Sequence, residues 1–189
     1  MENQPLASID AYDDISSHGQ YKIALEHGCT PAQALEYVHF RSRDNGRYPF
    51  SWTDGDNAGF TAGKPWLPAS PDRVRINAQR ELADPESLFH VYRRLLALRK
   101  EGDCRDALVD GAMTPYLPEQ KHLLAYWRHT GSIEDNGALL ILCNYQNAPQ
   151  RTALPGGAFG TVYDNYGRNG DVTGGMELRP YEAAILRRK

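Results

Sequence analysis

The chain has 189 residues, with 21 lysines and arginines against 24 aspartates and glutamates, so its formal charge at pH 7 is −3. This near-neutral balance argues against broad nucleic-acid binding, which needs a basic surface, and the longest apolar run, residues 138–143, is far too short to span a bilayer. We therefore expect a soluble, cytoplasmic protein without an export signal, which binds neither nucleic acid nor membranes and is shorter than a complete barrel enzyme of about 250 residues.

Two short helices are predicted near the amino terminus. Residues 13–27 carry apolar positions at helical spacing, and Gly28 suits the end of a helix. Thr30 and Pro31 then provide the N-cap and first turn of a second helix that extends to about residue 40. Neither helix carries many apolar residues, so neither has much core of its own to bury.

Residues 41–74 follow neither helical nor strand periodicity and contain repeated glycines and prolines. Loops of this length are uncommon in compact domains, and disordered segments are poor in aromatic residues. This segment contains Tyr48, Phe50, Trp52, Phe60 and Trp66. We expect an ordered loop whose aromatic side chains either line a binding cleft or fix the loop onto a helix surface.

The strongest helical pattern covers residues 84–101, with Asp84 as N-cap, Pro85 in the first turn and Gly102 as the stop signal. Its apolar residues form one wide stripe: Leu88, Val91, Tyr92, Leu95, Leu96 and Leu98. Monomers rarely expose large contiguous apolar patches. The stripe therefore predicts self-association through this helix face.

Short strands separated by turn residues are predicted after residue 107, at residues 108–109, 122–128, 138–145, 151–154, 160–163, 176–178 and 183–187. Strands without intervening helices favour an antiparallel β-sandwich. We expect an α+β chain in two parts, residues 1–102 with helices and a long loop, and residues 103–189 as the sandwich. The three cysteines form no CxxC pair, and neither a metal site nor a cofactor is expected.

Six segments resemble the α-glucosidases of glycoside hydrolase family 13. Residues 42–52 read SRDNGRYPFSW and are followed by NAGF at 57–60 and KPW at 64–66; further similar segments are residues 8–14, 77–100 and 179–183. The resemblance covers nearly the whole chain. It points to the group of oligo-1,6-glucosidases, dextran glucosidases, sucrose isomerases and trehalose-6-phosphate hydrolases.

The resemblance implies that residues 1–102 are the last segment of a (β/α)₈ barrel, with its active-site-rim loop. Retaining hydrolysis needs two carboxyl groups about 5–5.5 Å apart. In the resembled enzymes the catalytic carboxylates precede the segments matched here, and no aspartate of residues 10–56 lies in the corresponding motifs. The resemblance therefore predicts a chain without catalytic residues, inactive alone, whose partners are the missing barrel domain and, in the full-length parent, an oligosaccharide.

The same resemblance suggests substrate-binding residues in the loop. In these relatives an arginine of this segment faces the terminal glucosyl unit, and Arg47 is the first match, with Arg43 second. A guanidinium group suits this role because it donates hydrogen bonds to sugar hydroxyls in two directions. The competing interpretation is that Arg43 pairs with Asp44 and stiffens the loop. Tyr48 and Phe50 replace smaller family residues and are expected to narrow the rim.

Three functions remain open from the sequence. The first is the carboxyl-terminal part of a retaining α-glucosidase that acts on short α-1,6- or α-1,4-linked gluco-oligosaccharides. The second is a standalone carbohydrate-binding or structural module, with sugar-stacking candidates that are otherwise explained as sandwich core and rim: Trp127, Tyr145, Tyr163 and Tyr166. The third is part of a sucrose isomerase or transglycosylase.

Overall fold

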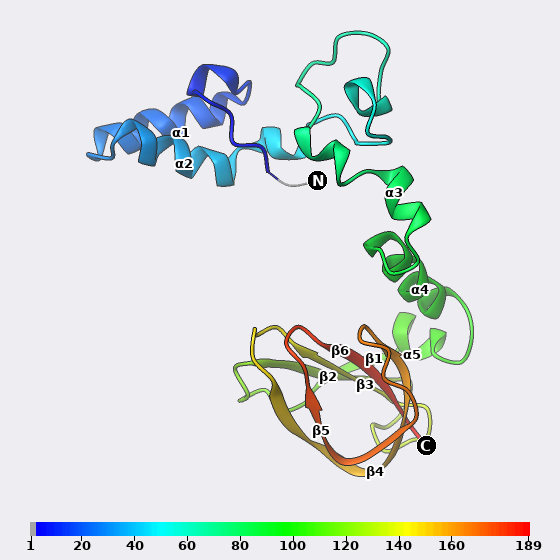
Figure 1. The fold of residues 1–189 in the computed structure, drawn as a ribbon. Helices are drawn as coiled ribbons and strands as arrows, with labels where there is room; N and C mark the ends of the chain where they lie inside the picture. The colour runs from blue at the N-terminus through cyan, green and yellow to red at the C-terminus, as the bar shows by residue number, and fades with distance from the viewer. Residues whose placement is uncertain (1–2) are drawn as a thin grey trace. The chain divides into compact units, whose positions relative to one another are not determined.

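The computed structural model describes residues 3–189, which form two compact units, residues 3–90 and 91–189 (Figure 1). The division falls within helix α4 (Leu88–Lys100). No helix in the described part of the chain combines the length and apolar character needed to cross a membrane.

The first unit is helical, as the sequence predicts. Its α-helices are α1 (Ile15–Glu26), α2 (Pro31–Arg41) and α3 (Ala78–Ala83), and its 3₁₀ turns are η1 (Ile9–Ala11), η2 (Arg43–Gly46), η3 (Asp56–Gly59) and η4 (Pro71–Val74). Helices α1 and α2 pack side by side as a hairpin (Figure 1). Gly28 has φ +84° just after α1, and Thr30 forms a capping box with Gln33 at the start of α2. Both predicted helices are confirmed.

The core of the first unit is small. Its buried apolar side chains include Tyr12, Ala34, Val38, Tyr48, Ala58 and Leu67. Large apolar side chains on every helix of this unit stay exposed, among them Ile15 (82 % exposed), Phe40 and Leu82. The unit therefore carries much more apolar surface than its own core covers.

The long loop is ordered around three 3₁₀ turns, and its five aromatic residues divide into two groups. Tyr48 is buried beside the other core residues, whereas four remain exposed: Phe50, Trp52, Phe60 and Trp66. The interpretation that the aromatic side chains fix the loop onto its own unit therefore holds for Tyr48 alone.

Helix α4 begins at Leu88, so the predicted start at Asp84 is wrong. Asp84 instead ends α3, and its carboxylate accepts a hydrogen bond from the Glu86 backbone N–H at 3.0 Å, which favours a turn. The predicted end is confirmed, with Gly102 at φ +76°. No side chain of α4 is buried.

The second unit contains one six-stranded antiparallel sheet in the order β1-β2-β3-β6-β4-β5 (Figure 1). Its strands are β1 (Ala112–Pro115), β2 (Leu123–His129), β3 (Leu139–Asn144), β4 (Gln150–Asp164), β5 (Asp171–Leu178) and β6 (Ala183–Arg188). The antiparallel architecture is confirmed. The two short strands predicted at 151–154 and 160–163 are one long strand, β4, with a register shift between Ala153 and Ala158.

The sheet curls so that one of its faces becomes the core. Trp127 on β2 lies 6.0 Å from Phe159 on β4, measured between ring centroids, and the Tyr116 hydroxyl donates to the Ala153 carbonyl at 3.1 Å. Strands distant in the sheet order therefore meet across its concave side, as two packed sheets would. Core residues alternate along β2, β3, β5 and β6, as period-2 patterning requires.

The predicted strand at residues 108–109 is wrong, because this segment belongs to helix α5 (Arg105–Val109). The Arg128 guanidinium donates to the carbonyls of Ala107 and Leu108, both at 3.1 Å, and so satisfies carbonyl groups at the end of the helix. Helix α5 lies against the outer face of the sheet, where Ala107 packs with Leu139 and Ile141.

Candidate functional site

The candidate site is built on the turn that follows α2. The Ser42 hydroxyl accepts a hydrogen bond from the Asp44 backbone N–H at 3.2 Å, which starts η2, and the Asn45 side-chain amide donates to the His39 carbonyl at 2.8 Å. These bonds fix a tight turn at the end of the helix. Of the candidate arginines, Arg43 is the first residue of this turn and Arg47 directly follows it.

Asp44 is the centre of the arrangement, and its side chain is fully buried. One carboxylate oxygen accepts the backbone N–H groups of Asp13 and Asp14, at 2.8 and 3.0 Å. The other accepts from Arg47 Nη1 at 3.1 Å. A buried carboxylate requires such charge-assisted partners, so Asp44 ties the start of α1 to Arg47.

Asp14 and Arg43 form a second pair. Arg43 donates to one Asp14 carboxylate oxygen through Nε at 3.0 Å and Nη2 at 2.5 Å, while its backbone N–H donates to the other oxygen at 3.2 Å. The Arg43 guanidinium holds the pKa of the Asp14 carboxyl well below its usual value. The alternative pairing of Arg43 with Asp44 is therefore wrong.

Arg47 lies beside an aromatic wall. Its guanidinium carbon is 5.9 Å from the ring centroid of Trp66, within the range of a cation–π contact. The Trp66 indole N–H donates to the Asp13 carboxylate at 3.1 Å, so the exposed ring is oriented by a second residue of the same cluster. An oriented indole face beside a guanidinium is a surface on which a sugar ring can stack.

The two arginines differ in how many N–H donors remain available to a ligand. A guanidinium has five N–H donors. Arg47 uses one of them on Asp44, whereas Arg43 spends both Nε and Nη2 on Asp14. The geometry therefore favours Arg47, the first candidate from the sequence, as the group that donates hydrogen bonds to sugar hydroxyls. Arg43 instead fixes α1 to the turn.

Tyr48 does not narrow the rim, contrary to the expectation, because its side chain is only 6 % exposed. Its hydroxyl has no hydrogen-bond partner among the described residues. Burial raises the pKa of Tyr48 to about 12. Phe50 is half exposed and contacts Trp52 edge to face, with ring centroids 4.7 Å apart.

Sequence reasoning missed Asp14 as the partner of Arg43, and it considered Asp44 as a partner of Arg43 and not of Arg47. The spacing of Asp44 and Arg47 across one turn was an available signal for their pair. Asp14 and Arg43 are 29 residues apart, and only the packing of α1 against the turn brings them together.

The acidic side chains of the candidate site are poorly suited to acid catalysis and to metal binding. Arg43 lowers the pKa of the Asp14 carboxyl, which makes Asp14 a poor proton donor. Both carboxylate oxygens of Asp44 are already engaged by Arg47 and two backbone N–H groups. No group of three or more histidine, cysteine, aspartate or glutamate side chains among residues 3–189 is arranged to hold a metal ion.

The sugar-stacking candidates of the second unit are mostly occupied by structural contacts. Trp127 is 1 % exposed and belongs to the core, so it is not a binding platform. The Tyr166 hydroxyl donates to the Pro180 carbonyl at 2.8 Å, and Arg179 lies over its ring. The Tyr145 hydroxyl donates to the Lys121 carbonyl.

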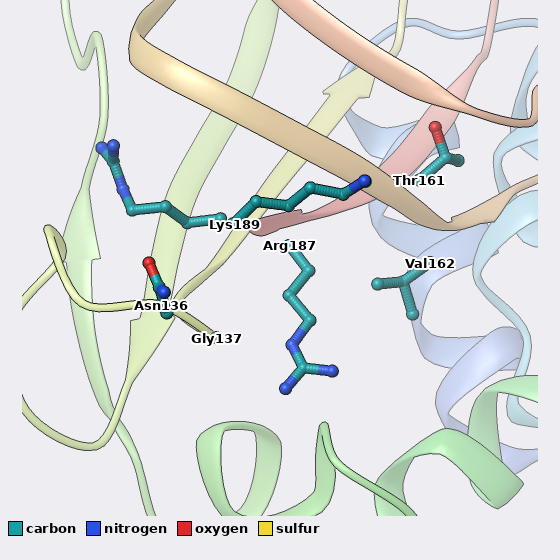
Figure 2. Close-up of a pocket in the computed structure, with 8 residues that line it drawn as sticks. Asn136, Gly137, Thr161, Val162, Arg187 and Lys189 are labelled. Carbon is teal, nitrogen blue, oxygen red and sulfur yellow. The ribbon is translucent and has the colours of Figure 1, made fainter.

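A cavity of about 400 Å³ lies in the second unit beside Arg187 and Lys189 (Figure 2). Arg188 also lines it, and all three cations are paired: Arg187 Nη1 lies 3.0 Å from the Asp103 carboxylate, Arg188 Nη2 lies 3.2 Å from that of Glu134, and Lys189 Nζ lies 2.6 Å from that of Asp171. The positive charge at this cavity is therefore already compensated.

Comparison with known proteins identifies the family to which the segment around Arg47 belongs. Residues 10–111 match the family described as "Alpha amylase, catalytic domain". An oligo-1,6-glucosidase of Parageobacillus thermoglucosidasius is 34% identical over 99% of this chain and 33% of its own length. A trehalose-6-phosphate hydrolase of Escherichia coli is 32% identical over 97% of this chain and 32% of its own length.

Solved structures agree with this grouping. A trehalose-6-phosphate hydrolase of Bacillus licheniformis superposes with a TM-score of 0.87 at 31% identity, over 100% of this chain and 34% of its own. A trehalulose synthase of Pseudomonas mesoacidophila superposes with a TM-score of 0.84 at 34% identity, over 99% of this chain and 33% of its own. The chain thus spans about a third of the length of the relatives that it matches.

Proposed function

The chain belongs to the α-amylase family, and on that premise we propose that its first unit supplies the Arg47 side of a glucosyl-binding site in an α-glucosidase. Arg47 donates hydrogen bonds to hydroxyls of the terminal glucosyl unit, and Trp66 stacks against the sugar. The complete enzyme cleaves α-1,6 or α-1,4 linkages of short gluco-oligosaccharides with retention of configuration. The observation that supports this most directly is the position of Arg47: buried Asp44 holds its guanidinium at 3.1 Å, and no other residue among 3–189 accepts a hydrogen bond from it.

We further propose that this chain does not hydrolyse glucosides alone. Retaining hydrolysis needs one carboxylate as nucleophile and one carboxylic acid as proton donor, with the pKa of the acid raised. Arg43 instead lowers the pKa of Asp14, and Asp44 has an arginine and two backbone N–H groups as partners. These contacts support a binding role for the cluster, with the reacting carboxylates supplied by the rest of the catalytic fold.

The proposed partner is therefore that remaining part of the fold. The exposed apolar side chains of the first unit, such as Ile15, Phe40 and Leu82, support this proposal because soluble domains rarely leave so many uncovered. When that part is absent, a second copy of this chain covers the exposed apolar face of α4, and the chain self-associates.

A chimera tests the function. This chain replaces the matching third of the Parageobacillus oligo-1,6-glucosidase, and hydrolysis of isomaltose and maltose is measured beside the isolated chain. We expect hydrolysis by the chimera and none by the isolated chain. A folded chimera without activity, or an isolated chain that releases glucose, contradicts the proposal.

A second candidate is an isomerase, because the solved trehalulose synthase matches at 34% identity with a TM-score of 0.84. In that case the enzyme transfers the glucosyl unit to another hydroxyl of the sugar from which it was cleaved, and not to water. Analysis of the products that the chimera forms from sucrose separates the two candidates. An isomerised disaccharide supports the isomerase, and glucose plus fructose supports the hydrolase.

A further inference from the structure

A groove of about 540 Å³ lies in the second unit, between the end of α4 and the outer face of the sheet. Helix α4 and the residue that follows it contribute side chains at the spacing i, i+3, i+4 and i+7, which is one face of a helix: Arg94, Ala97, Leu98 and Glu101. Strand β4 contributes Val162 and Tyr163. The volume falls within the range of small-molecule sites, about 300–1,000 Å³.

The end of α4 is fixed to the second unit. Arg99 Nη1 donates to the Leu108 carbonyl at 2.9 Å, which joins α4 to α5. The groove face of α4 lies opposite the exposed side chains of Leu88, Tyr92 and Leu96, because each residue advances around a helix by about 100°. Self-association through those three residues therefore leaves the groove open.

A β-bulge turns Tyr163 towards the groove. Neighbouring residues of a regular strand point to opposite faces of the sheet, and Val162 belongs to the outer face, where it packs against the cluster that includes α5. Strand β4 pairs with β6 at Thr161–Leu186 and again at Tyr163–Ile185, so Val162 is an extra residue between the two pairs. A bulge re-aims the side chains beside it. Val162 and Tyr163 consequently line the same groove.

Two polar groups of the groove are not engaged elsewhere. Among residues 3–189, the Tyr163 hydroxyl makes no hydrogen bond and the Glu101 carboxylate pairs with no cation. The hydroxyls of Tyr145 and Tyr166 differ, because both donate to backbone carbonyls, and Trp127 is buried. Of the four sugar-stacking candidates from the sequence, Tyr163 thus combines a place in a groove with an available hydroxyl.

The lining of the groove suits a neutral sugar. Glu101 and Arg94 carry opposite charges, so the groove as a whole favours neither an anion nor a cation. A carboxylate and a phenol hydroxyl both form hydrogen bonds with sugar hydroxyls. An aromatic ring beside small aliphatic side chains offers an apolar surface to the C–H face of a sugar ring; here that surface comprises Ala97, Leu98, Val162 and Tyr163.

We propose that this groove is a second carbohydrate site, which binds a short neutral gluco-oligosaccharide with one ring stacked on Tyr163 and its hydroxyls bonded to Glu101. The groove itself supports a sugar as ligand, whereas the choice of glucose rests on the proposed function. The site belongs to the second unit and binds without Arg47.

NMR spectroscopy of the isotope-labelled 189-residue chain, titrated with isomaltose, maltose and octanoate, tests the proposal. We expect both sugars to shift the backbone amide signals of residues 94–102 and 160–164, in the parent and in Arg47→Ala alike. Tyr163→Ala should weaken this binding about tenfold or more, because the stacking ring and its hydroxyl are lost together. Glu101→Gln, at an exposed position, should weaken it about fivefold without affecting folding.

The matched controls, Tyr145→Ala and Glu119→Gln, remove the same groups at exposed positions outside the groove and are expected to bind as the parent does. Sugars that leave the signals of residues 94–102 and 160–164 unshifted, or binding that Tyr163→Ala leaves unchanged, overturn the proposal. A response to octanoate alone also overturns it, because the groove would then be a site for apolar ligands.

Failure of this inference and failure of the proposed function give different results. An inactive chimera together with a groove that binds sugars contradicts the proposed function and supports the second site. An active chimera together with a groove that binds no sugar contradicts the second site and supports the proposed function.

Discussion

The Asp44 carboxylate accepts Arg47 Nη1 at 3.1 Å through one oxygen and the backbone N–H groups of Asp13 and Asp14 through the other. Asp14 in turn holds Arg43. The two acid–arginine pairs are thereby interlocked, and the start of α1 and the turn after α2 form one rigid support. The orientation of Arg47 depends on this support.

Removing the Asp44 carboxylate should unfold this support. Asp44→Ala leaves two backbone N–H groups and a guanidinium without their acceptor, and we expect a loss of about 2–4 kcal/mol in the free energy of unfolding of the first unit. Hydrogen exchange in increasing urea, followed separately for residues 3–90 and 91–189, measures this loss.

Asp54→Ala is the control for Asp44→Ala, because the pair of Asp54 with Arg80 is exposed and 3.9 Å long. This substitution should cost less than about 1 kcal/mol. Equal protection of residues 13 and 14 in Asp44→Ala and the parent would contradict this role.

The stability of the first unit should depend on pH through Asp14. Arg43 lowers the pKa of Asp14 in the folded state below its ordinary value of 3.8, so the unfolded chain binds more protons. The resulting stabilisation is present above about pH 4 and is lost as the pH falls below it. Urea unfolding at pH 6 and pH 3 checks this, with Asp14→Asn as the comparison, since asparagine also caps helices. A parent and variant that lose the same stability between these pH values would exclude Asp14 as the cause.

The local elements of this chain could be predicted because their signals are local. The capping pair of Thr30 and Gln33 marks the start of α2, and alternating apolar residues mark most of the strands. Asp84 was misplaced because an aspartate before a proline suits both a helix start and a turn, and here the end of α3 decides between them.

The candidate site was only partly predictable. The resemblance pointed to Arg47, but the partner of Arg43 depends on the packing of α1 against the turn, which no spacing in the sequence encodes. Likewise, the burial of Tyr48 follows from the tertiary structure, so its effect on the rim could not be read from its size.

The sheet of the second unit should depend strongly on Arg188. Its guanidinium lies over the rings of Trp127 and Phe159, 5.2 and 5.1 Å from their centroids, and donates to the carbonyls of Ile133 and Gly156. We expect Arg188→Ala to cost about 2–4 kcal/mol, because packing, cation–π contacts and hydrogen bonds are lost together. Hydrogen exchange of residues 91–189 in increasing urea measures it. Arg187→Ala is the matched neighbour, expected to cost less than about 1 kcal/mol through its exposed pair with Asp103; equal costs for the two would refute the distinction.

The apolar face of α4 should drive self-association. Leu88, Tyr92 and Leu96 follow each other at intervals of four residues on one helix face and are 69 %, 67 % and 49 % exposed. Sedimentation velocity over a concentration series should reveal dimers or larger species, shifted towards monomer by Leu88→Lys with Leu96→Lys. The control, Arg93→Gln with Lys100→Gln, alters charge outside this triplet and should leave association unchanged. A parent chain that is monomeric at every concentration would contradict the prediction.

The central claim is that Arg47, oriented by Asp44, binds the glucosyl unit, and the most direct measurement is kcat/KM for isomaltose in the oligo-1,6-glucosidase chimera. Arg47→Ala should lower kcat/KM about 30- to 150-fold, as the loss of charge-assisted hydrogen bonds predicts, and Arg47→Lys should recover only part of it because a lysine lacks the fork. Arg41→Ala, a nearby exposed arginine outside the site, should leave kcat/KM unchanged. A folded Arg47→Ala chimera with the kcat/KM of the Arg41→Ala control would contradict the account.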